Sequence, residues 1–123
     1  MREKEIEDKF REAVKRAGGK AYKFVSPGND GVPDRLVVMP GGHMGFVEVK
    51  APGKHPTPLQ QVRMRELRGL GCGVWVLDGL EGIDGVVAAV CKTSACVGLH
   101  PGEAEGKALS LCPTTTSGIV STA

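Results

Sequence analysis

Long hydrophobic runs are missing from this sequence of 123 residues. No stretch of about 18 consecutive apolar residues occurs, which excludes a helix that spans a membrane. The first five residues (MREKE) are mostly charged and lack the apolar segment of a secretory signal. We therefore expect a cytoplasmic, intracellular protein.

Charge of one sign is not in excess either. The chain has 16 Lys and Arg residues against 14 Asp and Glu residues, a formal net charge of +2. This balance excludes a polycation that binds nucleic acid through its total charge. It does not exclude a local basic surface, because a nucleic acid responds to how charges cluster on a protein.

Aromatic residues are scarce, and they stop early in the chain. They make up 4% of the sequence, and the last of them is Trp75. Beyond residue 90 the composition shifts to Gly, Ser, Thr, Pro and Ala without a sustained period. Such a segment has little apolar surface to offset the entropy lost on ordering. We predict one folded domain over residues 1–90 and a poorly ordered appendage over residues 91–123.

Cysteine occurs four times, but never in the short Cys-x2-Cys spacing of common structural zinc sites. Without an export signal, reduced thiols are the favoured interpretation. A zinc-linked interaction protein is the alternative. Its ligands would be Cys91, Cys96, His100 and Cys112.

The spacing of apolar residues predicts three helices. The first covers residues 3–17 and ends before two glycines. The second follows Thr57 and Pro58, which suit a helix cap and first turn, and ends near residue 70. A weaker third helix covers residues 80–90. The residues expected to face the core are Ile6, Phe10, Val14 and Ala17 in the first helix, and Leu59, Val62, Leu67 and Leu70 in the second.

Four short runs of β-branched and apolar residues predict strands at residues 21–25, 35–39, 44–50 and 74–77. Residues 40–43 (PGGH) form a turn between the middle two strands, which predicts a hairpin. The elements follow in the order α-β-β-β-α-β-α. This order favours a single α/β domain with a mixed central sheet.

Two segments beside this hairpin carry side chains suited to catalysis, the Gly31–Asp34 loop and the Phe46–Lys50 strand. A hairpin centred on Gly41 places Asp34 opposite or near Glu48 on the neighbouring strand. Residues that face each other across an antiparallel pair have Cβ atoms about 4.5–5.5 Å apart. We therefore expect the two carboxylates to lie close together.

Two carboxylates at this distance repel each other unless one is protonated or a cation lies between them. Oxygen ligands of this kind suit Mg²⁺ or Mn²⁺. Lys50 lies two residues beyond Glu48, so its side chain projects from the same face of the strand. There it can hold a water molecule or offset charge on a phosphate. Together these groups predict a site for phosphodiester hydrolysis.

These segments resemble the VRR-NUC (virus-type replication-repair nuclease) family, a branch of the PD-(D/E)XK nucleases. The resemblance covers about residues 3–80 and is similar to small stand-alone phage-type members. It implies a restriction-endonuclease-like core and DNA cleavage with Mg²⁺ or Mn²⁺, often at Holliday junctions or flaps. The segments that carry it are GVPDR at 31–35, the Gly-Gly turn, FVEVKAPG at 46–53 and T-x-LQ at 57–60.

Carried over to this sequence, the family implies Asp34 and Glu48 as metal ligands and Lys50 as the catalytic lysine. The helix-one glutamate of the family corresponds to either Glu3 or Glu7, which share one helix face, and we favour Glu7.

Gln60 resembles the glutamine of the family's Leu-Gln pair, where an amide could orient the lysine, a water molecule or a phosphate. The alternative is a solvated residue at the start of a helix. The predicted catalytic set is Glu7, Asp34, Glu48, Lys50 and Gln60, and the predicted metal set is Glu7, Asp34, Glu48 and Val49.

Residues 50–70 carry five Lys and Arg residues against one acidic residue. This local excess favours contacts with phosphates, and the chain has no aromatic platform for reading bases. The Ser26–Gly31 loop has few bulky side chains, which lets a sugar-phosphate backbone approach. The predicted DNA-binding residues are Ser26, Asn29, Arg35, Lys54, His55 and Arg63.

Symmetric cutting of a four-way junction needs two sites related by a twofold axis, so we expect a homodimer. Two further alternatives stay open. One is a duplex or nicking nuclease of the same superfamily. The other is a DNA-binding module that does not cleave, and the intact set of Asp34, Glu48 and Lys50 argues against it.

Overall fold

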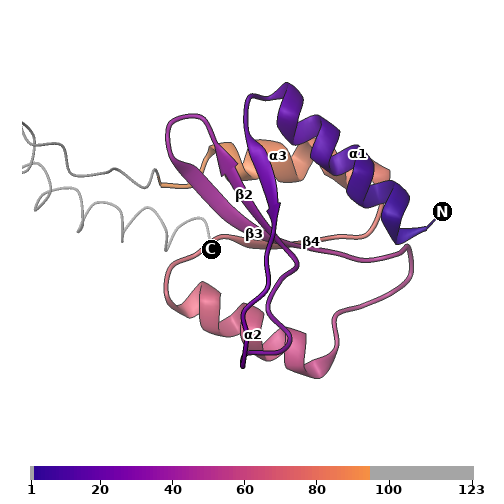
Figure 1. Cartoon of the computed structure of the whole chain (residues 1–123), viewed down its shortest axis with the longest axis vertical. Helices are drawn as coiled ribbons and strands as arrows, with labels where there is room; N and C mark the ends of the chain where they lie inside the picture. The colour runs from indigo at the N-terminus through magenta and orange to yellow at the C-terminus, as the bar shows by residue number, and fades with distance from the viewer. Residues whose placement is uncertain (1, 95–123) are drawn as a thin grey trace, which may run out of the picture.

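Four strands form one mixed sheet in the order β1-β2-β3-β4 in the computed structural model, which describes residues 2–94 (Figure 1). Strands β1, β2 and β3 are antiparallel neighbours, whereas β4 runs parallel to β3. The α/β class and the mixed sheet predicted from the sequence are confirmed. The strands are β1 (Lys20–Lys23), β2 (Arg35–Met39), β3 (His43–Val49) and β4 (Val74–Leu77).

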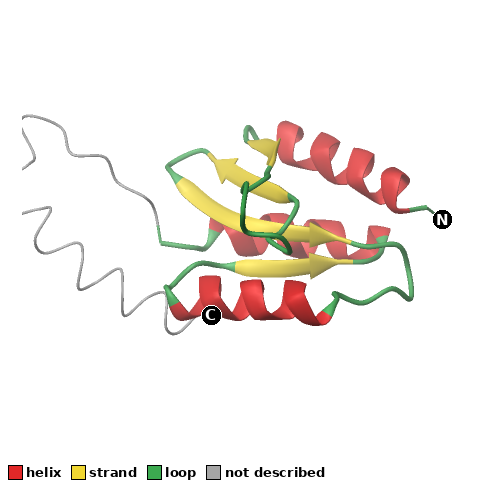
Figure 2. Cartoon of the chain, turned by 60° about the horizontal axis from the view of Figure 1, so that its bottom comes forward, coloured by secondary structure: helices red, strands yellow, loops and turns green. Residues whose placement is uncertain are grey.

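The three α-helices of the described residues cover the two faces of this sheet unequally (Figure 2). Helices α1 (Glu3–Arg16) and α3 (Ile83–Cys91) lie on one face, and α2 (Pro58–Gly69) lies on the other. A 3-10 turn, η1 (Leu80–Gly82), leads into α3 where the sequence predicted one weak helix. The fully buried side chains of the core between the sheet and the α1–α3 layer include Ile6, Phe10, Val14, Val37, Met39, Val47, Val49, Leu77 and Val90.

Helix α1 buries the stripe that its spacing predicts. Ile6, Phe10 and Val14 are each 0% exposed. Ala17 was expected to continue the stripe, but it is exposed. The reason is that the helix ends at Arg16, so the chain leaves the sheet surface before this position.

The β2–β3 hairpin has the register that the sequence predicts. Arg35 pairs with Val47 and Met39 pairs with His43, so the hairpin is centred on Gly41. Gly41 has a φ of +90°, a conformation that residues with a Cβ rarely adopt. The turn therefore determines which residues face each other at the far end of the hairpin.

Helix α2 begins with a capping box. The Thr57 hydroxyl accepts a hydrogen bond from the Gln60 N–H at 3.1 Å, and the Gln60 side-chain oxygen accepts one from the Thr57 N–H at 2.9 Å. Pro58 occupies the first helical turn, where its missing N–H costs nothing. The predicted start of this helix is confirmed, and its first turn is firmly held.

The core-facing side of α2 differs from the prediction. Leu59, Val62 and Leu70 are exposed and Leu67 is only half-buried, whereas Met64 is 4% exposed. Within residues 2–94, α2 is the only helix on its face of the sheet, where it packs against β4. A lone helix on a sheet buries only a narrow stripe, so most of its apolar residues stay in contact with water.

Packing continues slightly past the predicted domain boundary at residue 90. Helix α3 ends at Cys91, and the Thr93 carbonyl lies 2.6 Å from Nδ1 of His43. Cys91, a candidate zinc ligand, is exposed, while Cys96, His100 and Cys112 lie outside the described residues, as does the predicted appendage from residue 95 onward. No helix within residues 2–94 is long and apolar enough to cross a membrane.

The burial pattern of α2 yields a stability prediction. Met64→Ala should lower the free energy of unfolding by about 2–5 kcal/mol, because it leaves a cavity between α2 and the sheet. Leu70→Ala, at the end of the same helix, should change it by less than about 0.5 kcal/mol, because Leu70 is 82% exposed. Urea denaturation followed by circular dichroism measures both values. Equal losses would contradict the described orientation of the helix.

Candidate metal and active site

Asp34 and Glu48 lie at the same end of the sheet. The observed register pairs Arg35 with Val47, and its extension by one residue places Asp34 opposite Glu48. The Val49 N–H donates a hydrogen bond to Oδ1 of Asp34 at 3.2 Å. This main-chain contact holds the Asp34 carboxylate against the carboxyl end of β3.

Glu48 is a buried carboxylate, 4% exposed, with two side-chain partners. Nε2 of Gln60 donates a hydrogen bond to its Oε2 at 3.0 Å, and the Lys50 ammonium lies 3.4 Å from the same oxygen. Val47 and Val49 are buried among the core residues. Glu48 and Lys50 thus share the opposite face of β3, as the alternation of a strand requires.

Gln60 connects helix α2 to Glu48 through both ends of its side-chain amide. Its oxygen accepts a hydrogen bond from the Thr57 N–H at 2.9 Å, and its nitrogen donates to the Glu48 carboxylate. A carboxylate accepts hydrogen bonds only, so the amide has one sensible orientation. Gln60 therefore contacts Glu48 directly and is not merely a solvated residue at the start of the helix.

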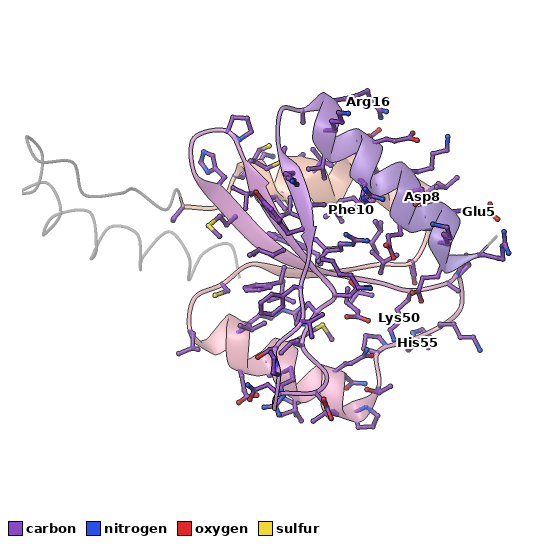
Figure 3. The ribbon with its side chains drawn as sticks, in the orientation of Figure 1. Glu5, Asp8, Phe10, Arg16, Lys50 and His55 are labelled. Atoms are coloured by element: carbon purple, nitrogen blue, oxygen red, sulfur yellow. The ribbon has the colours of Figure 1, made fainter. Side chains whose placement is uncertain are left out.

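Two glutamates of α1 approach Asp34 at this end of the sheet. One carboxylate oxygen from each of Glu3, Glu7 and Asp34 lies within 4.8 Å of the other two. Figure 3 shows the first turns of α1, marked by Glu5, on the same side of the molecule as Lys50. The sequence left Glu3 and Glu7 as alternatives, and the fold brings both of them to the cluster.

Arg35 was predicted to bind DNA, but the structure gives it a different position. The residue is 8% exposed, and its guanidinium donates hydrogen bonds to the Glu7 carboxylate and to the Ala21 carbonyl. It occupies the same side of β2 as the buried Val37 and Met39, which explains why it points toward α1. Arg35 therefore supports Glu7 and is not available to a phosphate. Strand alternation was the signal that could have revealed this role.

The central carboxyl groups have raised pKa values. Burial is the largest cause for Asp34, whose pKa is raised further by the α1 glutamates and lowered by a main-chain hydrogen bond. Burial also comes first for Glu48, where the Asp34 charge raises the pKa further and Lys50 lowers it. The ionised forms are therefore held at a cost in free energy that a bound cation would offset.

This set of donors fits a hard divalent cation. Glu7 and Asp34 of the predicted metal set offer carboxylate oxygens within the cluster, the ligands that Mg²⁺ and Mn²⁺ prefer. Glu48 lies outside this cluster, but its carboxylate is near enough to Asp34 for the two charges to interact. Val49, the remaining member, is 1% exposed and has an apolar side chain, so it offers only main-chain atoms. The cluster of Glu3, Glu7 and Asp34 includes neither an imidazole nor a thiol, the usual zinc ligands.

The predicted DNA-binding residues with basic or imidazole side chains differ in their surroundings. Lys54 and His55 are exposed on the loop after β3, a few residues beyond Lys50 in the chain. Arg63 instead donates to the Asp30 carbonyl at 2.9 Å and lies 3.0 Å from a Glu66 oxygen. It joins α2 to the loop before β2.

The predicted contact loop, Ser26–Gly31, is closed by its own hydrogen bonds. The Asn29 side chain donates to the Ser26 hydroxyl at 3.1 Å, and the Asn29 N–H donates to the Ser26 carbonyl at 3.0 Å. Gly31 has a φ of +89°, and a Cβ there would come within 2.8 Å of Leu59 Cγ. The loop is thus seated against α2.

The raised pKa of Asp34 yields a pH prediction for the metal-free protein. A carboxyl with a raised pKa in the folded state contributes stability below its unfolded pKa and loses it as the pH rises through the folded pKa. Asp34→Asn should therefore be more stable than the wild type at pH 7 in EDTA, and this difference should vanish near pH 3.

Urea unfolding from pH 3 to pH 8 measures this effect. The exposed Asp78→Asn serves as the control and should show little difference at either pH. An Asp34→Asn variant that is less stable than the wild type at pH 7 would contradict the described environment of the carboxylate.

Comparisons with known proteins identify the family. No family model matches the sequence. The chain is 52% identical over 81 residues to "Putative nuclease p44" of Acyrthosiphon pisum secondary endosymbiont phage 1, covering 66% of this chain and 87% of that protein. It also matches a solved structure described as "VRR_NUC domain", with a TM-score of 0.66 and 29% identity over 70% of this chain and 94% of the other. The chain therefore belongs to the VRR-NUC family of nucleases, as its sequence motifs predicted.

Proposed function

We propose that this chain is an endodeoxyribonuclease that uses Mg²⁺ or Mn²⁺ to hydrolyse phosphodiester bonds, with selectivity for branched DNA such as Holliday junctions or flaps. One observation carries the proposal: three elements bring acidic groups and a lysine to one end of the sheet. Strand β2 is preceded by Asp34, β3 carries Glu48 with Lys50 after it, and α1 carries Glu7. Family membership and the phage relative support the same class of reaction.

The residues that would hold the metal ion are Glu7, Asp34 and Glu48, with the main chain of Val49 beside them. When bound, a divalent cation supplies positive charge that stabilises a phosphate as negative charge develops on it. The protein prepares the Glu48 carboxylate for this task by burial and by the Gln60 hydrogen bond, which restricts its rotation.

Lys50 is the residue that would act on the phosphate and the attacking water. Its side chain is 16% exposed, with the ammonium 3.4 Å from Glu48 Oε2. The main-chain N–H of Lys50 donates a hydrogen bond to the Leu77 carbonyl at 2.8 Å, so the Lys50 main chain is fixed to the sheet. An ammonium held in this way can donate a hydrogen bond to water and offset charge on a phosphate oxygen without reorganising.

A DNA-binding module without cleavage is less well supported. The buried Glu48 lies close enough to Asp34 for that charge to raise its pKa. Such an arrangement costs free energy and brings the fold no benefit. Perturbed carboxylates of this kind are typical of catalytic sites.

The proposed substrate is branched DNA, and the proposed active form is a homodimer. The exposed side chains beside the site, Lys54 and His55, suit phosphate recognition, which reads the shape of DNA more than its sequence. Two symmetric cuts in a four-way junction need two sites related by a twofold axis. The phage origin of the relative supports a role in the DNA metabolism of a phage or a bacterial cell.

The catalytic proposal predicts metal-dependent cleavage. The protein should cut a four-way junction or a 5′ flap with Mg²⁺ or Mn²⁺ and not in EDTA. Glu48→Gln and Lys50→Met should each lower the rate at least about 100-fold, because each removes a charge that acts at the reacting phosphate. Gel assays on junction, flap and linear duplex measure the rates.

The matched control is Lys92→Met, an exposed lysine just after α3, which should cut at the wild-type rate. Intact DNA in every metal-containing lane would overturn the nuclease proposal. Equal cutting of linear duplex and junction would favour the duplex or nicking alternative.

The dimer proposal predicts the products of mixed subunits. Wild-type protein should cut both strands of a junction symmetrically. An excess of Glu48→Gln subunits should convert these paired cuts into single nicks, because most of the dimers that contain a wild-type subunit then hold one active site. Sedimentation should give the mass of two chains. A monomeric mass together with unchanged paired cuts would contradict the dimer.

A further inference from the structure

A second basic segment lies outside the one predicted to contact DNA. Between Glu12 and Asp30 the chain has four Lys and Arg residues and no acidic residue. Figure 3 shows Arg16 of this segment on the opposite side of Phe10 from Lys50 and His55. The four cations are Lys15, Arg16, Lys20 and Lys23.

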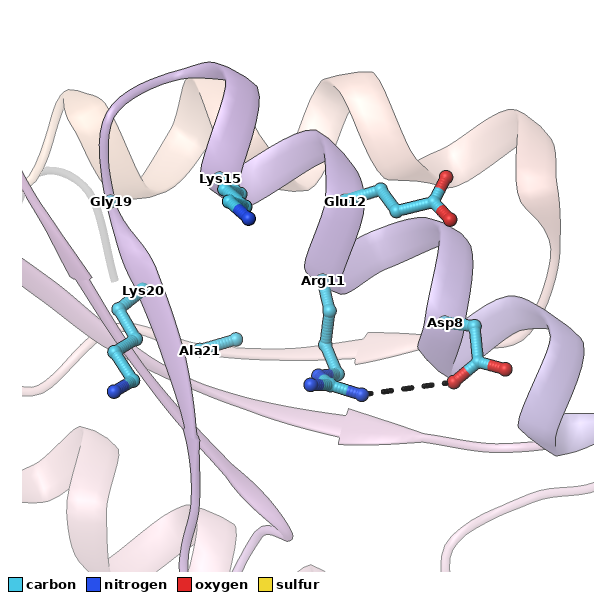
Figure 4. A pocket seen from close by; sticks show the side chains of 7 residues that line it. All are labelled: Asp8, Arg11, Glu12, Lys15, Gly19, Lys20 and Ala21. Carbon is cyan, nitrogen blue, oxygen red and sulfur yellow. Dashed lines mark ion pairs between the residues drawn. The ribbon is translucent and has the colours of Figure 1, made fainter.

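Part of this segment lines an open cleft of about 650 Å³ between α1 and β1 (Figure 4). Arg11 and Lys15 line it from α1, and Lys20 lines it from β1. Gly19 and Ala21, also in the lining, have small or no side chains. They complete the lining of the cleft on the side of the edge strand β1.

The two acidic side chains of the cleft are paired with lysines that do not line it. Asp8 lies 3.5 Å from the Lys4 ammonium, and Glu12 lies 3.9 Å from the Lys9 ammonium. Asp8 also lies 3.8 Å from Arg11, as Figure 4 shows. Both acidic side chains of the cleft thus already have basic partners within the protein.

Two cations of the cleft have no such compensation. Among residues 2–94, neither Lys15 nor Lys20 has a carboxylate within ion-pair distance. The Lys20 ammonium lies 4.8 Å from the centre of the Tyr22 ring. This cation–π contact helps to position the ammonium but does not neutralise its charge. The cleft thus presents positive charge that an anion from outside can use.

The carboxylate cluster and the cleft take residues from one stripe of α1. Glu3, Glu7, Arg11 and Lys15 follow each other at intervals of four residues, so they are neighbours on the helix surface. The rise from Glu7 to Lys15 is about 12 Å at about 1.5 Å per residue. That distance matches three to four nucleotides of one strand at about 3.4 Å each.

We infer that the cleft between α1 and β1 binds the phosphate backbone of a nucleic-acid strand that continues to the carboxylate cluster. This inference rests on the proposed nuclease function and adds the path that the bound strand follows across the protein surface. The strand crosses the cluster from the loop that carries Lys54 and His55 to Lys15 and Lys20. The contacts are with phosphates, so they contribute affinity without sequence preference.

The test compares two double variants that each remove two cations. Lys15→Ala/Lys20→Ala removes the uncompensated charges of the cleft. Arg16→Ala/Lys92→Ala is the control: both residues are exposed, neither lines the cleft, and neither pairs with an acidic residue that lines it. Binding of a labelled junction is measured by fluorescence anisotropy in Ca²⁺ at several salt concentrations, and cleavage of the same junction in Mg²⁺ is measured in parallel.

The cleft variant should bind about tenfold more weakly at 150 mM salt, and its slope of log affinity against log salt should be shallower by about 1–2. In cleavage, kcat/KM should fall while kcat at saturating DNA stays near the wild-type value. The control should show clearly smaller changes in both readouts. Equal effects of the two double variants, or an unchanged salt slope in the cleft variant, would overturn the inference.

The two proposals fail in different ways. A wild-type protein that binds the junction through the cleft but cuts no DNA with any metal would overturn the nuclease proposal and leave the binding path standing. A wild-type protein that cuts, with a cleft variant that behaves like the control, would overturn the path and leave the nuclease proposal standing. Thermal unfolding of both variants shows that neither result comes from loss of folding.

Discussion

Mutual repulsion between carboxylates is the constraint on which the site depends. Asp34 and Glu48 face each other at the end of a hairpin, and burial makes their charges costly. The fold keeps them in place with three donors: the Val49 N–H, the Gln60 amide and the Lys50 ammonium. The proposed divalent cation would offset the repulsion that remains between the two carboxylates.

The two helical layers both take part in holding this site. Helix α1 reaches it through Glu7, which receives a hydrogen bond from the buried Arg35 of β2. Helix α2 reaches it from the opposite face through Gln60, whose side chain both caps the helix and binds Glu48. The position of the carboxylates therefore depends on the packing of both faces of the sheet. A change that moves either helix should disturb the cluster even when no ligand residue is altered.

Charge is distributed so that a near-neutral chain can still bind a polyanion. The net charge is +2, yet residues 15–23 and 50–68 are both locally basic. The fold places the first segment beside the α1–β1 cleft and puts Lys54 on the loop after β3. The acidic cluster lies between these regions. A nucleic acid held by both would bring a phosphate to the carboxylates, where a cation would offset the repulsion.

The sequence by itself determined the features that depend on local spacing. Strand alternation and the centre of the turn at Gly41 were enough to place Asp34 opposite Glu48 and to put Lys50 on the same face. Only the tertiary structure decided the rest. The burial of Arg35 against Glu7 and the exposure of Leu70 depend on which helix covers which face of the sheet. Such contacts join residues far apart in the chain, so a local pattern can indicate the face on which a side chain lies but not the partner that it meets there.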